Sequence, residues 1–256
     1  MAQIVAIANQ KGGVGKTTTA VNLAASLAAA ERRTLLIDLD PQANSTSGVG
    51  VDPNGLELTV YQVLLGEAPA LAVRQNTPLA HLHLLPANPD LIGAEVELIG
   101  ALAREGKLKS ALAAAQDSYD YILIDCPPSL GLLTINALTA ADRVLIPLQC
   151  EYYAMEGLSQ LLNTVRLIQR ELNPKLALLG ILLTMFDARN NLSHQVVEEI
   201  RRHFAGEVFE TMIPRNVRLS EAPSHGLPAL LYDIASRGAT AYLDLAREII
   251  RREPLT

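Results

Sequence analysis

Seven short runs of apolar residues recur along the 256-residue chain, separated by segments long enough to hold helices. Hydrophobicity is largely continuous within these runs, whereas a strand with one face in water alternates apolar and polar residues. Continuous runs are typical of strands buried on both faces of a parallel sheet. The runs cover residues 4–8, 34–37, 83–85, 121–124, 144–148, 178–183 and 208–213.

The segments between these runs carry apolar residues at helical spacing, so they predict helices that each bury one face. The segment VNLAASLAAA, residues 21–30, follows the first strand. Two later segments each keep one face apolar, through Leu158, Leu161, Leu162, Val165, Ile168 and Leu172 in the first and Val196, Val197, Ile200 and Phe204 in the second. Alternating strands and helices predict an α/β fold: a doubly wound, mostly parallel sheet with helices on both faces. Ligands bind such a sheet outside the carboxyl ends of its strands.

Composition favours a single domain spanning residues 1–256. With 49% hydrophobic residues, a chain of this length can bury one large core. We find no linker, repeat or low-complexity tract, and residues 52–55 and 66–69 have the composition of surface loops. The C-terminal segment AYLDLAREIIRREPLT predicts a docked final helix, whose apolar face carries Tyr242, Leu243, Ala246, Ile249 and Ile250.

The sequence favours a cytoplasmic protein. No basic and apolar leader precedes the first strand, and no uninterrupted apolar run reaches about 18 residues. The two cysteines, Cys126 and Cys150, are too few and too far apart for a CxxC site. Such sparse cysteine is typical of a reducing compartment.

The segment QKGGVGKTTT, residues 10–19, stands between the first strand and the first helix. The pattern G-x-x-x-x-G-K-[ST] describes a loop whose backbone N–H groups surround phosphates, followed by a lysine and a hydroxyl that binds magnesium. Gly12 and Gly13 permit a tight turn, although Gln10 replaces the first glycine of the pattern. The helix N-terminus that follows favours anions. The segment therefore predicts binding of a nucleoside triphosphate with Mg²⁺ by Lys11, Gly12, Gly13, Val14, Gly15, Lys16, Thr17 and Thr18.

Two carboxylate-bearing segments, LLIDLDPQANSTSG and YILIDCPPSLG, each begin in an apolar strand. We expect Asp125 to hold Mg²⁺ through its water shell opposite Thr17. Asp38 would support the same water network, and Asp40 would orient or deprotonate the attacking water. Each aspartate also has a simpler interpretation as a solvated loop residue or helix cap. The Pro127-Pro128 pair stiffens the second loop, which is a candidate switch that senses the γ-phosphate.

Lys11 stands five residues before Lys16, the lysine expected to cover the phosphates of its own subunit. One interpretation is a solvated surface lysine, the common fate of this residue. Another is that two subunits meet through their phosphate loops and each donates Lys11 to the other's phosphates, as an arginine finger does in trans. The loop KGGVGKTT resembles the deviant Walker A motif of the ParA/MinD/nitrogenase-iron-protein class of ATPases. In that class the extra lysine reaches across an ATP-sandwich dimer.

Three further motifs narrow this resemblance. DLDPQANSTSG, DCPPSLG and IPRNVRLSEAPSHG together resemble the ParA/Soj chromosome-partition branch, and the similarity runs over residues 3–253. It implies an ATP-dependent homodimer, non-specific binding of double-stranded DNA on the nucleoid, and slow hydrolysis stimulated by a ParB-type partner. It also implies that Pro214 and Asn216 line the adenine pocket. Without the resemblance, Pro-Arg-Asn after a strand is simply a turn.

DNA binding has to be reconciled with an acidic chain, whose net charge is −6. Residues 1–159 carry nine Lys and Arg against sixteen Asp and Glu, whereas residues 160–256 carry twelve against eleven. Phosphate contacts need local positive patches rather than a basic whole. Any one surface arginine can equally pair with a nearby acid, and no base-reading motif is present, so binding should be independent of sequence. The candidates are Arg189, Arg218, Arg201 and Arg202, with Arg215 and Arg237 in the same C-terminal portion.

Three other functions compete with this one. A MinD-like membrane-associated ATPase would share the Lys11 loop but needs a basic amphipathic tail beyond the final helix. An iron–sulfur protein needs paired cysteines shared across the dimer, which Cys126 and Cys150 do not suggest. A metabolic amidoligase of the same superfamily stays open, although the sequence carries no additional substrate motif.

Overall fold

A seven-stranded sheet forms the centre of the computed structural model, which describes residues 1–151 and 154–252, and its strand order is β3-β4-β2-β5-β1-β6-β7. All neighbouring strands run parallel except β3, which is antiparallel to β4 at one edge. The strands are β1 (Gln3–Ile7), β2 (Thr34–Asp38), β3 (Gln75–Asn76), β4 (Leu82–Leu85), β5 (Tyr121–Asp125), β6 (Arg143–Gln149) and β7 (Ala177–Thr184). The predicted doubly wound, mostly parallel sheet is therefore confirmed.

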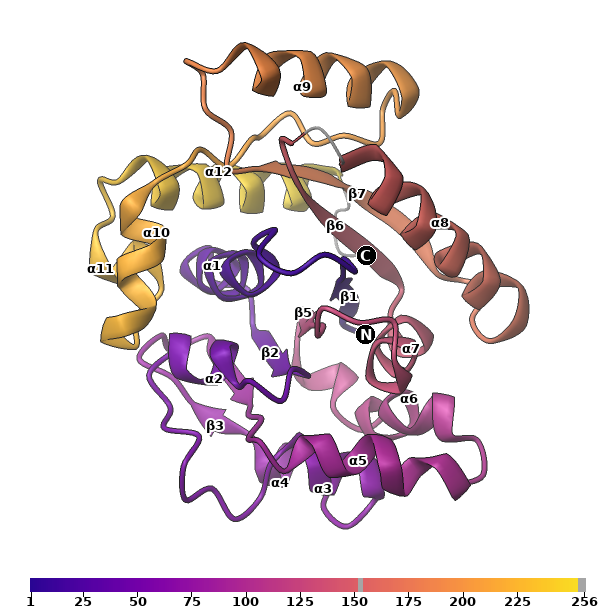
Figure 1. Ribbon diagram of the computed structural model, residues 1–256. Coiled ribbons are helices and arrows are strands. Elements are labelled where there is room, and N and C mark those ends of the chain that lie inside the picture. The colour runs from indigo at the N-terminus through magenta and orange to yellow at the C-terminus, as the bar shows by residue number, and fades with distance from the viewer. Residues whose placement is uncertain (152–153, 253–256) are drawn as a thin grey trace.

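Helices cover both faces of the sheet (Figure 1). Alternate residues of β1 enter different cores: Ile4 packs with the layer that holds α7 and α8, and Val5 packs with the layer that holds α1 and α12. This two-sided burial explains why the strand is hydrophobic throughout. The α-helices are α1 (Lys16–Ala29), α2 (Asn44–Gly48), α3 (Val60–Leu65), α4 (Ala70–Val73), α5 (Leu91–Glu97), α6 (Lys107–Leu112), α7 (Leu132–Ala140), α8 (Ala154–Glu171), α9 (Asn191–His203), α10 (Val217–Glu221), α11 (Ala229–Tyr232) and α12 (Arg237–Arg252). The short 3₁₀ helices are η1 (Leu98–Gly100), η2 (Arg104–Gly106), η3 (Gln116–Ser118) and η4 (Ala222–His225).

The prediction of a strand over residues 208–213 is wrong. This segment runs beside β7 but forms only isolated bridges, at Val208 and at Pro214. The backbone N–H groups of Glu210 and Thr211 donate instead to the buried carboxylate of Glu248 on α12, at 2.8 and 2.9 Å. Phe209 and Ile213 still donate to Ile181 and Leu183 of β7, so the segment follows β7 without forming a continuous ladder.

Smaller expectations also differ from the structure. The two-residue strand β3 was not predicted, because Gln75 and Asn76 are polar. Leu172 was expected on the buried face of α8, but it lies in the turn beyond the helix and is 37% exposed. The final helix does dock as predicted, through buried Tyr242 and Ile249, although residues 253–256 lie outside the described part of the chain.

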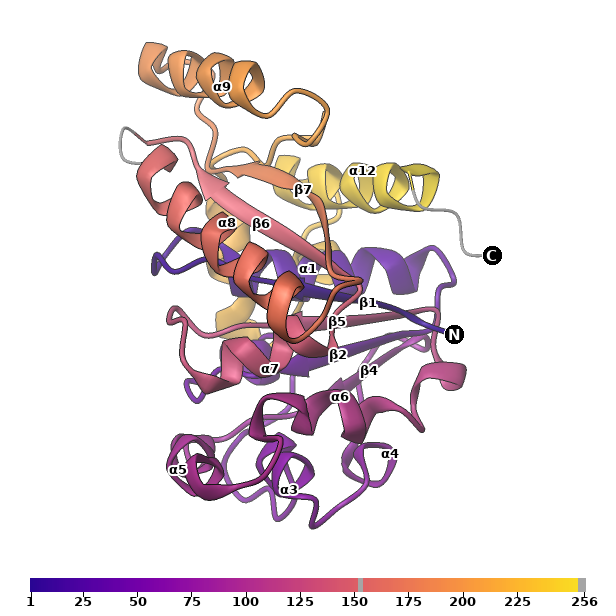
Figure 2. The same cartoon turned by 90° about the vertical axis from the view of Figure 1, so that its right-hand side faces the viewer.

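The sheet places the predicted site residues together at the carboxyl ends of its central strands. β1, β2 and β5 are neighbours, and Asp125 is the register partner of both Ile7 on β1 and Asp38 on β2. The loop from β1 to α1 leaves the sheet at this same end of the strands (Figure 2). In the described residues, no helix combines the length and the apolar character needed to cross a membrane.

Candidate active site

The loop between β1 and α1 has the backbone that the glycine pattern predicts. Gly13 and Gly15 have φ values of +75° and +90°, in the region where a Cβ would be strained. Gly15 is also the N-cap of α1. Val14 is buried, and its carbonyl accepts a 2.8 Å hydrogen bond from Thr184 Oγ1 at the end of β7. The loop is thus fixed both by its own glycines and by a contact with a distant strand.

Lys16 is buried at the start of α1 and its Nζ donates to the carbonyl of Lys11, at 3.0 Å. Burial lowers the pKa of Lys16, while the carboxylates of Asp125 and Asp40 oppose that change. The backbone holds the Lys16 side chain over the loop, and two carboxylates lie near it, which is the arrangement that a phosphate-binding lysine needs.

A cavity of about 330 Å³ opens in front of this loop. The side of the cavity that faces the loop carries Asp40, Gln42 and Asn44 from the segment after β2, together with Pro128 and Met185. Asp40 is largely buried there, and its Oδ1 accepts from the backbone N–H of Gln42 at 2.9 Å. The predicted phosphate loop, the predicted water-orienting carboxylate and the predicted switch loop therefore face one space.

Asp38 and Asp125 lie side by side in the sheet but are bonded very differently. Asp38 Oδ2 accepts from both the backbone N–H and the hydroxyl of Thr46, at 2.7 and 2.8 Å, so this carboxylate anchors α2. Asp125 Oδ2 accepts from Ser45 Oγ at 2.7 Å. Asp125 Oδ1 is buried and has no hydrogen-bond partner in the described part of the structure.

The unpartnered oxygen of Asp125 tests whether this site suits Mg²⁺. Burial raises the pKa of Asp125 and the neighbouring Asp38 raises it further, whereas the side chains of Ser45 and Thr17 act in the opposite direction. A buried carboxylate with a free lone pair and a negative neighbour is unfavourable unless a cation compensates it. No cluster of three or more His, Cys, Asp or Glu spaced for a metal occurs among the described residues. Mg²⁺ takes one or two carboxylates together with substrate phosphates, so a buried carboxylate beside a phosphate loop fits it.

In the single subunit the side chain of Lys11 contacts a neighbouring acid. Its Nζ forms a 2.8 Å ion pair with Glu151 Oε2, just beyond the end of β6. The other carboxylate oxygen of Glu151 accepts from the side chain of Gln149. Each of the two paired side chains is about half exposed. In the single subunit Lys11 is thus neither free in solvent nor directed at its own phosphate loop.

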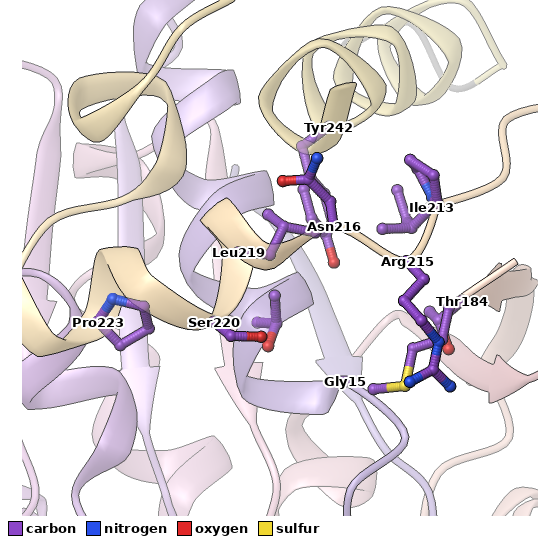
Figure 3. Close-up of a pocket in the computed structure, with 12 residues that line it drawn as sticks. Gly15, Thr184, Ile213, Arg215, Asn216, Leu219, Ser220, Pro223 and Tyr242 are labelled. Carbon is purple, nitrogen blue, oxygen red and sulfur yellow. The ribbon is translucent and has the colours of Figure 1, made fainter. Parts of the chain in front are cut away.

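A second cavity, of about 300 Å³, adjoins the phosphate loop on the side of α1 (Figure 3). It contains Pro214 and Asn216, as the resemblance implied, and Asn216 also caps α10 through its Oδ1. Sequence reasoning assigned no nucleotide contact to the other lining residues beyond Gly15 and Thr18, some of which belong to the same IPRNVRLSEAPSHG motif and the others to β7, the residue after it and α12. Those residues are Thr184, Met185, Ile213, Arg215, Leu219, Ser220, Pro223 and Tyr242.

Met185 is the most unusual of these missed residues. It has φ of +52°, rare for a residue with a side chain, and it lines both cavities. Strained backbone of this kind concentrates at ligand sites. Its position directly after the last buried strand was the one signal in the sequence, because ligands bind at the carboxyl ends of such strands.

The candidate DNA-binding arginines do not form one group. Arg189, Arg215 and Arg237 line a third cavity, of about 340 Å³. Arg189 is 91% exposed and pairs with Asp187 at 3.2 Å. Arg218 lies apart on α10, where it pairs with both Glu221 and Asp233, at 2.7 and 3.3 Å. Arg201 and Arg202 are exposed in the last turn of α9.

Comparison with known proteins extends over the whole chain. An AAA-domain family profile matches residues 2–178. The chromosome partitioning protein ParA of Myxococcus xanthus is 59% identical over 98% of this chain and 89% of its own length. The sporulation initiation inhibitor protein Soj of Bacillus subtilis is 59% identical over 97% of this chain and 98% of its own.

Two solved structures show the same arrangement of elements. The cell division ATPase MinD of Pyrococcus furiosus superposes with a TM-score of 0.81 at 27% identity, covering 99% of this chain and 100% of that one. Cobyrinic acid a,c-diamide synthase of Mycobacterium smegmatis, solved with a bound ATP analogue and magnesium, gives 0.87 at 41% identity, covering 98% of this chain and 96% of that one.

Proposed function

Because the chain belongs to the ParA/Soj family of chromosome-partitioning ATPases, we propose that it uses ATP binding and hydrolysis to attach to DNA and release from it. The observation that carries the proposal is the buried Asp125 oxygen without a partner, at the strand end beside the phosphate loop. The residues to which we assign ATP and Mg²⁺ lie in a single domain.

The phosphate loop and Lys16 bind the triphosphate, and Pro214 and Asn216 contact the adenine. Mg²⁺ would be held by Thr17 and Asp125 and would neutralise charge on the phosphates. Asp38 acts indirectly, because its hydrogen bonds to Thr46 fix α2 beside the site. Asp40 orients the attacking water from the wall of the phosphate cavity.

We further propose that two ATP-bound subunits pair through their phosphate loops, each donating Lys11 to the nucleotide of the other. Lys11 must leave Glu151 for this to happen. A half-exposed ion pair contributes only about 0–1 kcal/mol, so the γ-phosphate charge of the facing ATP can displace the carboxylate. The Lys11–Glu151 ion pair therefore opposes dimerisation when no nucleotide is bound, but it is too weak to prevent dimerisation when ATP is bound.

The DNA surface is proposed to centre on Arg189, Arg215 and Arg237, with Arg201 and Arg202 on the adjoining α9. These side chains meet phosphates and not base edges, so binding is independent of sequence. Arg218 contributes less charge than expected, because two acids offset it. Hydrolysis is slow until a ParB-type partner stimulates it, and the protein acts on the nucleoid in the cytoplasm.

A MinD-like membrane role is the alternative, and the structure offers it little support. The apolar face of α12 is already buried against α1 through Tyr242, which hydrogen-bonds Thr19 at 3.1 Å. Flotation of the ATP-bound protein with anionic vesicles separates the two functions, because only the membrane-associated ATPase would rise with the lipid.

Asp40→Ala tests the proposed reaction directly. The substitution removes the group that orients water but leaves the phosphate loop intact, so hydrolysis should fall by on the order of 10²–10⁴. ATP binding and DNA retention should persist, because the γ-phosphate is no longer removed. Steady-state phosphate release with DNA and partner present measures the first effect, and normal turnover would contradict the assignment.

A further inference from the structure

The helix α5 is apolar on two faces. Leu91, Ala94 and Leu98 are buried in the core. Ile92, Val96 and Ile99, spaced by four and three residues, share the opposite side and are 60–68% exposed. Leu102, just beyond η1, is 92% exposed. We call Ile92, Val96, Ile99 and Leu102 the α5 stripe.

The stripe is unusual for a surface of this protein. Twelve large hydrophobic side chains are exposed in the described part of the chain, and four of them fall within these eleven residues. Scattered exposed apolar residues need no explanation, but a contiguous group rimmed by polar residues marks an interaction site. The core does not need these side chains, because the buried face of α5 already packs against it.

Carboxylates surround the stripe. Glu95 and Glu97 stand on α5 itself, and Asp90 is the residue before it. Glu97 accepts a 2.6 Å hydrogen bond from Tyr61 on α3. That hydrogen bond raises the pKa of the Tyr61 hydroxyl, and burial and the nearby carboxylates of Glu67 and Asp90 act in the same direction. One cation does reach the stripe: Arg104 donates to the backbone carbonyl of Ile99 at 2.9 Å, and Glu105, paired with Arg104, offsets its charge.

This charge pattern decides between two occupants. A second copy of the chain meeting the stripe about a two-fold axis would place Glu95, Glu97 and Asp90 near the same residues of its partner. Like charges held together in an interface oppose association. A segment with apolar side chains flanked by Lys or Arg matches both the stripe and its rim.

The stripe is also linked to the hydrolytic site. The carboxylate of Glu95 lies against Gly131 and leaves no room there for a Cβ. Gly131 is the N-cap of α7 and closes the loop over residues 126–131, whose Pro128 lines the phosphate cavity. Both α5 and the phosphate loop lie on the side of the molecule where the central strands end (Figure 2). A contact on α5 is thus one side chain away from the loop that follows Asp125.

From these observations we propose that the α5 stripe is the docking surface for a basic, amphipathic segment of a protein partner. Docking would press Glu95 against Gly131 and so reposition the loop beside Asp125, which gives the partner access to the rate of hydrolysis. The inference rests on the proposed function, in which a ParB-type protein stimulates the ATPase, and it locates where that protein acts.

The test compares stimulation by the purified ParB-type protein of the same genome, with DNA and ATP present. Val96→Ser combined with Ile99→Ser removes two exposed apolar anchors and touches no residue of the active site. The partner concentration for half-maximal stimulation should rise at least about tenfold, as for an interface hot spot. Glu97→Lys should have an effect in the same direction, because it reverses the charge of the rim. Leu167→Ser, at an exposed leucine on α8, is the matched control and should behave as wild type.

Basal hydrolysis and ATP-dependent DNA retention should be unchanged in all these variants, which also establishes that they fold. Stimulation equal to wild type in both the serine and the lysine variants would overturn the inference. So would loss of the ATP-bound dimer in size-exclusion chromatography, because the stripe would then join two copies of the chain. A wild-type protein that the partner never stimulates would contradict the proposed function itself.

Discussion

Two neighbouring aspartates show how single residues divide the work of this site. Asp38 uses its oxygens to accept hydrogen bonds from Thr46 and from the backbone N–H of Asp40, so it is satisfied without any ligand. Asp125 keeps one buried oxygen without a partner in the described part of the structure. The first carboxylate shapes the loop, and the second is left for a cation that the nucleotide brings.

Asp125→Asn should therefore stabilise the nucleotide-free protein. Burial raises the pKa of Asp125 above its ordinary value. Above pH 4 the Asp125 carboxyl ionises freely in the unfolded state. In the folded state its ionisation is disfavoured, so the folded wild-type protein loses stability progressively until the pH passes the raised pKa. The free energy of unfolding of Asp125→Asn should exceed that of the wild type by on the order of 2 kcal/mol at pH 8 and by almost nothing near pH 4.

Thermal unfolding at several pH values measures this gain, with Asp117→Asn as the control for loss of an exposed carboxylate. Stabilisation by Mg²⁺ and ATP should disappear in Asp125→Asn but not in the control. A variant less stable than wild type at pH 8 would mean that the Asp125 charge is already compensated inside the subunit.

Glu151→Gln should make dimerisation easier. The substitution removes the negative partner of Lys11, and a dimer that needs both lysines gains from both subunits. Since each pair is worth about 0–1 kcal/mol, the dimer should form at a protein concentration several-fold lower. Analytical ultracentrifugation with ATP measures this. Weaker dimerisation would show that Glu151 itself belongs to the interface.

At the scale of helices and strands, most of the fold follows from hydrophobic pattern. Six of the seven predicted runs are strands in the structure, because a buried parallel strand needs little beyond continuous apolar residues. The exception, 208–213, is interrupted by the polar pair Glu210-Thr211, and Glu248, about forty residues later, accepts from the N–H groups of that pair. A local pattern cannot anticipate a competing acceptor from a distant helix.

The candidate site, like the fold, has one part that local sequence patterns predict and one part that they do not. The phosphate loop and Asp38, Asp40 and Asp125 lie in contiguous motifs at strand ends, so their convergence could be predicted from the sequence. The cavity that holds Pro214 and Asn216 also draws on Tyr242 from the middle of α12, away from any strand end. The contact between Lys11 and Glu151 spans 140 residues, and no local motif announces it.

The arginines on separate elements should contribute unequally to DNA binding. Replacing Arg189 and Arg237 with Ala removes two charges of the shared cavity from each subunit. A dimer without these four guanidinium groups neutralises fewer DNA phosphates, so the slope of log K against log salt should become shallower by roughly three to four. Arg218→Ala should cost less, because Glu221 and Asp233 already offset its charge.

Fluorescence anisotropy with a random duplex at several salt concentrations measures these slopes, and Arg170→Ala, an exposed arginine on α8, is the control. If Arg218→Ala weakens binding more than the double variant does, the DNA surface lies on α10 instead.

At the scale of the whole molecule, the two proposed surfaces lie at opposite ends of the sheet. The α9 end, beyond β7, carries candidate DNA contacts, and the α5 end lies beyond β2 and β4 (Figures 1 and 2). The charge follows this division, since residues 1–159 are strongly acidic and residues 160–256 are close to neutral. DNA and a basic partner can therefore bind one dimer together without competing for the same surface.

The central claim is that ATP-dependent pairing through Lys11 creates the DNA-binding form. Retention of a random duplex, measured with ATP, ADP and no nucleotide beside size-exclusion chromatography, tests it most directly. Wild type should dimerise and retain DNA with ATP alone. Lys16→Ala should fail because it cannot bind ATP, whereas Lys11→Ala should bind ATP as a monomer and retain no DNA. A Lys11→Ala protein that dimerises and holds DNA as wild type does would contradict this claim.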